Sequence, residues 1–302
     1  MIRGLLLIAL AALLWATTGI VAKFLFTTTE LAPIALGFLR LAVALPFFLL
    51  LMWREQRALS DGPRWPSPLA LLPLLALGVF QALYQGSYLV AVDLTGAGIA
   101  TLIALCLSPV LVAILAVPLL GERPGLVTLI ALAAAIAGTT MLVAGDIGSS
   151  GELRLAGLLM ALFAALLYAG FTLTSRYSSS GTPVFTTAFV CFGTAALILL
   201  PVTAATGGFE GLGSLTARHW LMVFYIGVVP TCIGYVCFFS GMKTTPATLS
   251  SIIVTLEPLF VALLAWLLLG EELGAMGVTG AIILTLAVVA ASRANRPHTV
   301  TQ

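Results

Sequence analysis

Ten apolar stretches, each long enough to cross a bilayer as a helix, occupy most of this 302-residue chain. Each residue advances a helix by about 1.5 Å, so roughly 20 mostly apolar residues are needed for one crossing. The short breaks between the stretches carry Gly, Pro, Ser or charge, which is typical of turns. We therefore predict an all-α integral membrane protein with ten transmembrane helices, at Gly4–Phe26, Ala32–Trp53, Leu69–Ala91, Ala97–Leu120, Gly125–Ala144, Leu155–Ser175, Val184–Ala204, Ala217–Gly241, Ala247–Leu269 and Gly274–Ser292.

The composition supports a membrane protein and argues against several functions. Apolar residues make up 61% of the chain and charged residues 8%, whereas a soluble domain carries about a quarter charged residues. The net charge of +2 and the lack of a Lys/Arg-rich tract give no basis for nucleic-acid binding. The cysteines show neither a disulfide framework nor metal-ligand spacing, so we expect no cofactor; they are Cys106, Cys191, Cys232 and Cys237.

The basic residues predict the orientation of the chain. With the N-terminus inside, only Arg154 and Arg218 fall in outer segments. Nine others fall on the inner side: Arg3, Arg54, Arg57, Arg64, Arg123, Arg176, Lys243, Arg293 and Arg296. Because inner loops are enriched in Lys and Arg, we predict a multi-pass protein of the bacterial inner membrane with both termini in the cytoplasm. A cleaved signal peptide is the alternative for the first stretch, and the internal repeat described next disfavours it.

The chain contains an internal duplication. A shift of 149 places LSPVLVAILAVPLLGE (107–122) on LEPLFVALLAWLLLGE (256–271), with ten of sixteen positions identical. A shift of 153 places GLLLIALAALLWA (4–16) on GLLMALFAALLYA (157–169), with eight of thirteen identical, and puts Lys23 on Arg176. Apolar bias inflates matches of Leu and Ala, but it does not align Pro, Gly and Glu.

The duplication predicts the domain organisation. We expect one five-helix repeat at 1–145, a second at 154–293 and a cytoplasmic tail at 294–302. Five is an odd number, so the second repeat enters the membrane inverted. Inverted repeats are typical of secondary transporters, in which they give two conformations open to opposite sides of a central site. Two repeats can supply both halves of a cavity, which is compatible with a monomer.

These features resemble a known family. Ten helices in two halves, each with a Pro-centred fourth span that ends in PLLGE or LLLGE, are similar to the EamA branch of the drug/metabolite transporter superfamily. The resemblance implies export of amino acids and other metabolites, and a cavity lined by spans one to four and six to nine with spans five and ten behind. Leu14–Ala16 and the tyrosines of span three are also similar to YddG-type aromatic amino acid exporters.

Two charged residues inside spans are the first candidates for a substrate site. A charge at mid-membrane costs about 2.5–3.5 kcal/mol on insertion scales, so Glu257 is expected to face a cavity or a partner. It could bind a substrate amine, accept a proton, or only bond carbonyls freed by the adjacent proline. Arg40 could hold a substrate carboxylate with its planar guanidinium, or form a structural ion pair. Lys23 lies near a span end, where reaching the interface is the simpler reading.

Aromatic and amide side chains form the second group of candidates. Gln81, Tyr84, Gln85 and Tyr88 follow an i, i+3, i+4, i+7 spacing and share one face of span three, which predicts a cavity-facing stripe. The repeat-matched Trp15 and Tyr168 could stack on a substrate ring or simply pack. The remaining substrate-site candidates are Ser108, Thr172 and Tyr235, with Thr17, Thr18, Thr231, Ser251 and Thr255 as lesser ones.

The repeat-matched prolines Pro109 and Pro258 predict gates. Proline removes a backbone hydrogen bond and kinks a helix, so matched prolines could let equivalent spans flex in each half. One proline alone would mean little, because proline is common in transmembrane helices.

The sequence therefore predicts a secondary transporter that exports small metabolites, chiefly amino acids including aromatic ones, by alternating access. No P-loop is present, so ATP is not the direct energy source. A proton-coupled efflux pump for lipophilic cations is the main alternative, with Glu257 as the acid, and Arg40 argues against it. An enzyme or a sensor would need catalytic groups or an extramembrane domain that the sequence lacks.

Overall fold

The structure, a computed structural model, describes residues 2–58, 66–95, 97–147, 155–179, 181–270 and 274–294, without the side chains of 97–99, 144–147 and 269. Within these ranges all regular structure is helical. Ten helical segments of the described chain are long and apolar enough to cross a membrane, as predicted. Glu271 of the second LLLGE motif and residues 295–302 of the tail lie outside the described residues.

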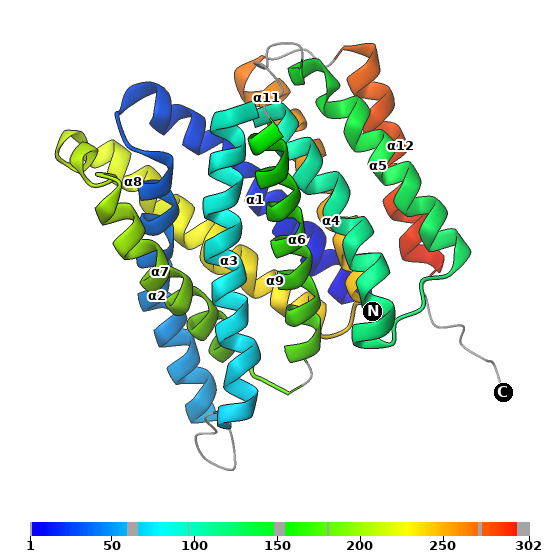
Figure 1. Ribbon diagram of the computed structural model, residues 1–302, viewed down its shortest axis with the longest axis horizontal. Helices are drawn as coiled ribbons and strands as arrows, with labels where there is room; N and C mark the ends of the chain where they lie inside the picture. The colour runs from blue at the N-terminus through cyan, green and yellow to red at the C-terminus, as the bar shows by residue number, and fades with distance from the viewer. Residues whose placement is uncertain are drawn as a thin grey trace.

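The helix bounds agree with the predicted spans to within a few residues (Figure 1). The first five spans are α1 (Ile2–Thr28), α2 (Pro33–Ala58), α3 (Pro68–Thr95), α4 (Ala97–Leu120) and α5 (Leu126–Ile147). The second five spans, with a 3₁₀ turn η1 and a π segment η2, are α6 (Leu155–Ser178), α7 (Val184–Ala205), η1 (Glu210–Ser214), α8 (Ala217–Ile226), η2 (Gly227–Ile233), α9 (Gly234–Met242), α10 (Ala247–Val254), α11 (Leu256–Leu269) and α12 (Ala275–Ala294).

The bundle has two distinct ends. Both Ile2 and Ala294 lie at one of them, because ten spans alternate in direction; we call it the terminal end, and the other the opposite end. At the terminal end, the starts and ends of neighbouring helices are in close contact. A Cβ on Gly4 would lie 3.0 Å from the carbonyl oxygen of Gly241, so the start of α1 and the end of α9 touch through their backbones.

Helices α5 and α12 form a pair at one side of the bundle (Figure 1). A Cβ on Gly138 would lie 2.8 Å from the carbonyl oxygen of Gly280, so the two helices are in backbone contact. Small residues allow this approach, which is how membrane helices pack without a hydrophobic driving force between them. The other helices surround a core rich in Phe, Ala and Leu, and the outer face is apolar, with Leu69 82% exposed.

The eighth span is interrupted by a π segment that the sequence did not lead us to predict. Pro230 lies inside η2 and has no N–H to donate to the carbonyl of Ile226. The hydroxyl of Thr231 donates a hydrogen bond to that carbonyl instead, at 2.8 Å. At Gly227 a Cβ would lie 3.1 Å from the carbonyl oxygen of Arg40, so η2 packs directly on the backbone of α2. π segments of this kind are frequent at functional sites.

The ninth span is divided into α10 and α11 at Thr255, whereas α4, its predicted repeat counterpart, is continuous. Pro258 has no N–H for the carbonyl four residues earlier, which favours this division. Helix α4 contains both Pro109 and Pro118 and still runs unbroken. The matched prolines thus lie in helices of different shape, and their gating role stays a prediction.

Candidate functional site

A cavity of about 580 Å³ lies among the helices of both halves. Its size is within the range of about 300–1,000 Å³ that is usual for small-molecule sites. The lining residues, in chain order, are Trp15, Thr18, Gly19, Ala22, Lys23 and Phe26 of α1; Pro33, Leu36, Gly37 and Arg40 of α2; Tyr84, Gln85, Tyr88, Leu89 and Val92 of α3; Thr101, Ala104 and Leu105 of α4; and Tyr168, Tyr235 and Glu257.

The cavity extends toward the opposite end of the bundle. Phe26 and Pro33, which line it, stand beside the α1–α2 connection at that end. Among the described residues, none of the lining side chains belongs to the helix turns at the terminal end. Spans one to four supply most of the lining, and no described side chain of α5, α7 or α12 contributes to it.

Arg40 is held in the cavity wall by one hydrogen bond. Its Nη2 donates to the Oε1 of Gln85 at 2.8 Å. Its Nε is buried and has no hydrogen-bond partner among the described residues. Burying a donor without a partner is costly, and a guanidinium is suited to bidentate contact with a carboxylate. Arg40 is therefore equipped to receive a carboxylate from the cavity.

Glu257 faces the same cavity from the first turn of α11. Thr255, where the span is divided, lies two residues before Glu257 and keeps right-handed helical dihedrals, with φ −63° and ψ −6°. Arg40 and Glu257 are close enough for their charges to interact. One cavity thus contains a fixed cation and a carboxylate.

Five of the aromatic side chains that line the cavity pack against one another. Tyr84 packs against Tyr168 with ring centroids 5.3 Å apart, and against Tyr88 at 5.9 Å. Trp15 packs against Tyr235 at 4.7 Å. Flat rings of this kind offer an aromatic ligand offset or edge-on contacts.

Eight of the eleven predicted substrate-site residues line the cavity: Trp15, Arg40, Tyr84, Gln85, Tyr88, Tyr168, Tyr235 and Glu257. The face predicted for span three is present, because Tyr84, Gln85 and Tyr88 all point into the cavity. Gln81 lies one turn deeper and donates its Nε2 to the hydroxyl of Tyr235 at 3.2 Å.

Ser108 and Thr172 are buried away from the cavity lining, and Thr172 bonds the carbonyl of Tyr168 at 3.0 Å. Of the lesser candidates only Thr18 lines the cavity, and Lys23, for which we favoured the interface, lines it as well. The other four lesser candidates each bond a backbone carbonyl of their own span: Thr17, Thr231, Ser251 and Thr255. Within the described ranges, no three His, Cys, Asp or Glu side chains gather as metal ligands.

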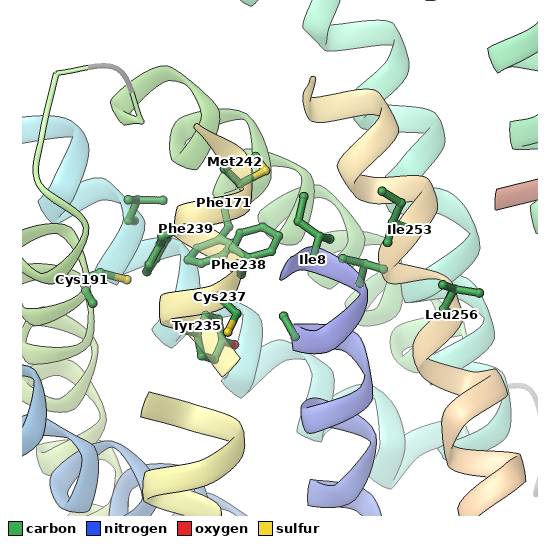
Figure 2. Packing of buried hydrophobic residues seen from close by; sticks show 14 of the residues in the cluster. Ile8, Phe171, Cys191, Tyr235, Cys237, Phe238, Phe239, Met242, Ile253 and Leu256 are labelled. Atoms are coloured by element: carbon green, nitrogen blue, oxygen red, sulfur yellow. The ribbon is translucent and has the colours of Figure 1, made fainter. Parts of the chain in front are cut away.

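Buried aromatic residues fill the bundle between the cavity and the terminal end (Figure 2). Tyr235 contacts Phe171 and Phe239, with ring centroids 6.2 and 6.3 Å apart. Phe171 stacks on Phe238 at 6.0 Å, and Met242 lies one turn further along α9. The exposed fraction is at most 3% for Phe171, Phe238, Phe239 and Met242. The cavity is therefore closed toward the terminal end.

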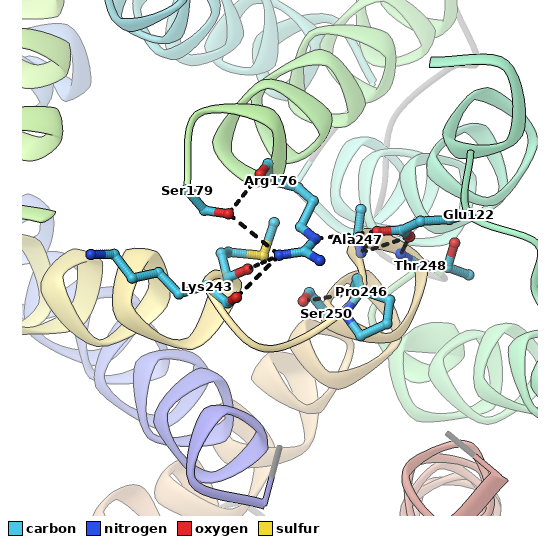
Figure 3. Close-up of polar contacts among 9 residues, drawn as sticks. Glu122, Arg176, Ser179, Lys243, Pro246, Ala247, Thr248 and Ser250 are labelled. Atoms are coloured by element: carbon cyan, nitrogen blue, oxygen red, sulfur yellow. Dashed lines mark hydrogen bonds and ion pairs between the residues drawn. The ribbon is translucent and has the colours of Figure 1, made fainter. Parts of the chain in front are cut away.

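A polar contact between the two halves lies beyond these aromatics (Figure 3). Glu122 accepts hydrogen bonds from the backbone N–H of Ala247 at 2.9 Å and of Thr248 at 3.4 Å, at the start of α10. Arg176, at the end of α6, pairs with Glu122 at 3.3 Å and donates to the carbonyl of Met242 at 2.9 Å. An anion at a helix start and a cation at a helix end are both favoured by the helix dipole.

The local sequence explains how Glu122 reaches α10. Gly121 ends α4 with a positive φ of 69°, a conformation that glycine adopts without steric cost. The N–H of Gly121 donates to the carbonyl of Val117, which is the αL type of helix end, and the N–H of Glu122 donates to the carbonyl of Ala116. In the sequence, Glu122 marks the duplication, and its contact with α10 is not predicted there. A helix-ending glycine followed by a carboxylate was the available signal.

A second carboxylate makes a similar contact at the same end. Glu55, in the last turn of α2, accepts hydrogen bonds from the backbone N–H of Phe185 at 3.1 Å and of Thr186 at 3.2 Å. The neighbouring Gln56 donates to the hydroxyl of Thr186 at 2.9 Å. Both Glu55 and Glu122 thus bind a helix start of the second half from the first half.

Comparison with known proteins gives a consistent result. The model of the EamA-like transporter family matches the chain twice, at residues 2–144 and 155–293. The uncharacterized transporter YwfM of Bacillus subtilis (strain 168) is 31% identical over 96% of this chain and 94% of its own length. The pseudopaline exporter CntI of Pseudomonas aeruginosa (strain UCBPP-PA14) is 27% identical over 97% of both chains. These relatives give no evidence for the YddG-type exporters specifically.

The fold also occurs among solved structures. A protein crystal structure covers 97% of this chain and 98% of its own with a TM-score of 0.79. Its sequence identity is 21%, so the likeness concerns the fold alone.

Proposed function

Since the chain belongs to the EamA-like transporter family and is a multi-pass membrane transporter, we propose that it exports small zwitterionic metabolites, chiefly amino acids and aromatic ones among them, by alternating access. One observation carries the substrate class. Arg40 and Glu257 line the same cavity, and Arg40 carries a buried donor without a hydrogen-bond partner among the described residues.

The two charged groups match the two charges of a zwitterion. A carboxylate accepts hydrogen bonds from the guanidinium of Arg40, while an ammonium lies against the carboxylate of Glu257. Each charge of the ligand then meets its opposite inside a cavity walled by apolar and aromatic side chains, where such contacts are stronger than in water. The faces of Tyr84 and Tyr168 remain for the side chain of the ligand.

Alternating access is supported by the duplication. The family model matches once in each half, and the sequence repeat places five spans in each, so the halves are expected to be inverted relative to each other. The relative CntI is named as an exporter, which supports outward transport here. Location in the bacterial inner membrane with cytoplasmic termini follows from the distribution of Lys and Arg.

Counterflow in proteoliposomes tests the substrate class. The vesicles contain purified protein and unlabelled phenylalanine, and labelled phenylalanine is offered outside together with one of two competitors. The first competitor lacks the carboxylate and the second lacks the amine. We expect the zwitterion to exchange and each competitor to inhibit weakly, because each can satisfy only one of Arg40 and Glu257. No exchange above protein-free vesicles for any amino acid of a complete panel would refute the proposal.

Efflux of lipophilic cations is the second candidate. An acid in an aromatic cavity also suits a cation, and Glu257 lies among Tyr84, Tyr168 and Tyr235. The guanidinium of Arg40 repels such a ligand. Exchange of the amine that lacks a carboxylate, coupled to a pH gradient and without exchange of phenylalanine, would favour this second function.

A further inference from the structure

Equivalent faces of α1 and α6 have opposite surroundings. The shift of 153 residues that aligns spans one and six places Ala22 and Lys23 on Ser175 and Arg176. Ala22 and Lys23 line the cavity near the opposite end. Ser175 is 2% exposed near the terminal end, and Arg176 is engaged there with Glu122.

The same difference separates α4 from α10. The shift of 149 places the cavity-lining Thr101 and Leu105 of α4 on Ser250 and Val254 of α10. Ser250 and Val254 are buried, at 0% and 3% exposure. Two helix faces that form an open pathway in the first half thus have sequence-matched counterparts in the second half that are packed shut.

The polar contact at Glu122 joins the elements that close this second face. Glu122 holds the start of α10, and Arg176 ties the end of α6 to the carbonyls of Met242 and Lys243 at the end of α9 (Figure 3). The start of α10 and the ends of α6 and α9 therefore meet at the pair of Glu122 and Arg176, and the turn at Gly121 fixes Glu122 to α4. Glu122 must leave the α10 start before these elements can separate at the terminal end.

We propose that Glu122 and Arg176 form a latch that holds an inward pathway, lined by the matched faces of α6 and α10, closed in this outward-open state. The latch opens once in each transport cycle. This inference rests on the alternating access in the proposed function, but not on the identity of the substrate. It assigns a positioning role to Glu122 and Arg176, since they act through α10 and do not touch the cavity.

The fold allows α10 to move once it is released. Helix α10 has eight residues and is divided from α11 at Thr255, so it can tilt without dragging the longer α11. Both latch residues face the boundary of the bundle, and Arg176 is 30% exposed, so water can replace their partners. Such a contact is strong enough to favour one state and weak enough to break in every cycle.

Two cysteine reporters test the latch by their opposite responses. Ser175→Cys lies on the closed face and Ala22→Cys on the open one. Each reporter is introduced alone, once into the chain that retains Glu122 and once into the Glu122→Gln variant. An impermeant thiol reagent is applied from either side of sealed membranes without substrate, with the reporter-free chain as background. We expect Glu122→Gln to raise labelling of Ser175→Cys about tenfold and to lower labelling of Ala22→Cys, since charged hydrogen bonds are lost from one state only.

Matched variants distinguish the latch from the loss of any carboxylate and from general loosening of the bundle. Glu210→Gln removes a carboxylate at the opposite end and should leave both reporters unchanged. Arg176→Gln should shift the reporters in the same direction as Glu122→Gln, and the double variant should add little, because both changes break one contact. Increased labelling of both reporters would indicate general loosening and overturn the latch, as would no response in either single variant. Because no substrate is added, failure here is distinct from failure of the substrate assay.

Discussion

The two ends of the bundle are built from the same kinds of helices but joined in different ways. At the terminal end, Glu55 and Glu122 of the first half bind helix starts of the second half. At the opposite end, Thr28 of the first half lies 3.4 Å from His219 of the second, and nearer the middle of the bundle the hydroxyl of Tyr225 donates to that of Thr17 at 3.2 Å. Charged contacts to helix termini close one end, and the cavity extends to the other. The difference shows how a duplicated fold can be asymmetric in a single state.

The matched spans four and nine show a similar asymmetry. Helix α4 is continuous through Pro109, whereas the ninth span is divided at Thr255, three residues before Pro258. The same residue at matched positions therefore allows a division without enforcing it. Packing decides the outcome, and the divided span is the one that carries Glu257 and that Glu122 holds at its start.

The largest expected effect concerns which end faces the cytoplasm. We predict that Gly181→Cys at the terminal end is labelled only from inside and Gly213→Cys at the opposite end only from outside, by an impermeant thiol reagent in sealed cells. A Cβ at either position meets open space, so neither change disturbs packing. Gly211, in the same loop as Gly213, is less suitable because a Cβ there would lie 2.8 Å from the carbonyl oxygen of Glu30. The reverse pattern would invert the comparison and make the cavity inward-open.

The second prediction concerns Arg40 in the open part of the bundle. Arg40→Ala should reduce amino acid exchange roughly a hundredfold, because it removes the proposed carboxylate partner and leaves the Oε1 of Gln85 without its donor. Arg40→Lys retains the charge but loses the planar guanidinium, so its exchange rate should lie between those of the wild type and Arg40→Ala. Counterflow rates at equal protein content measure the effect. Equal rates in all three proteins would remove Arg40 from the substrate site.

Much of the fold could be predicted from the sequence, because each crossing requires a run of apolar residues. The divisions at Thr255 and in η2 could not. Pro230 and Pro258 lie at or near them, but Pro109 and Pro118 lie in an unbroken helix, so proline alone does not identify a break. Thr231 of the same span satisfies the carbonyl freed at Pro230, but the packing of Gly227 on the backbone of Arg40 joins segments far apart in sequence, and that information is not local.

The candidate site was predictable only in part, for a related reason. The spacing in span three identifies one face, and Tyr84, Gln85 and Tyr88 do line the cavity. Isolated hydroxyls such as those of Ser108 and Thr172 belong to no such pattern, so the sequence does not indicate whether these side chains face the cavity. The contact between Glu122 and Ala247 joins residues 125 apart in sequence, and no local pattern predicts it.

The third prediction concerns Glu257, which lies where the open and closed parts of the bundle meet. Glu257→Gln should reduce exchange of phenylalanine about tenfold by removing the charge opposite the ammonium, while inhibition by the competitor that lacks the amine is retained. The counterflow assay measures both. A variant that keeps full exchange but loses the response to a pH gradient would make Glu257 a proton carrier. Wild-type exchange with a wild-type pH response would remove it from the mechanism.

The smallest expected effect tests whether the aromatic wall selects the ligand. Tyr84 packs on Tyr168 and Tyr88 while facing the cavity, and a ring contact contributes about 0.5–1.5 kcal/mol beyond burial of area for an aromatic ligand. Tyr84→Ala should therefore reduce exchange of phenylalanine by roughly three- to tenfold and that of threonine less. Tyr84→Phe retains the ring and should be nearly silent. Equal losses for both amino acids would show that Tyr84 supports the cavity wall rather than the ligand, and the contrast between the open and closed ends would then rest on the charged residues alone.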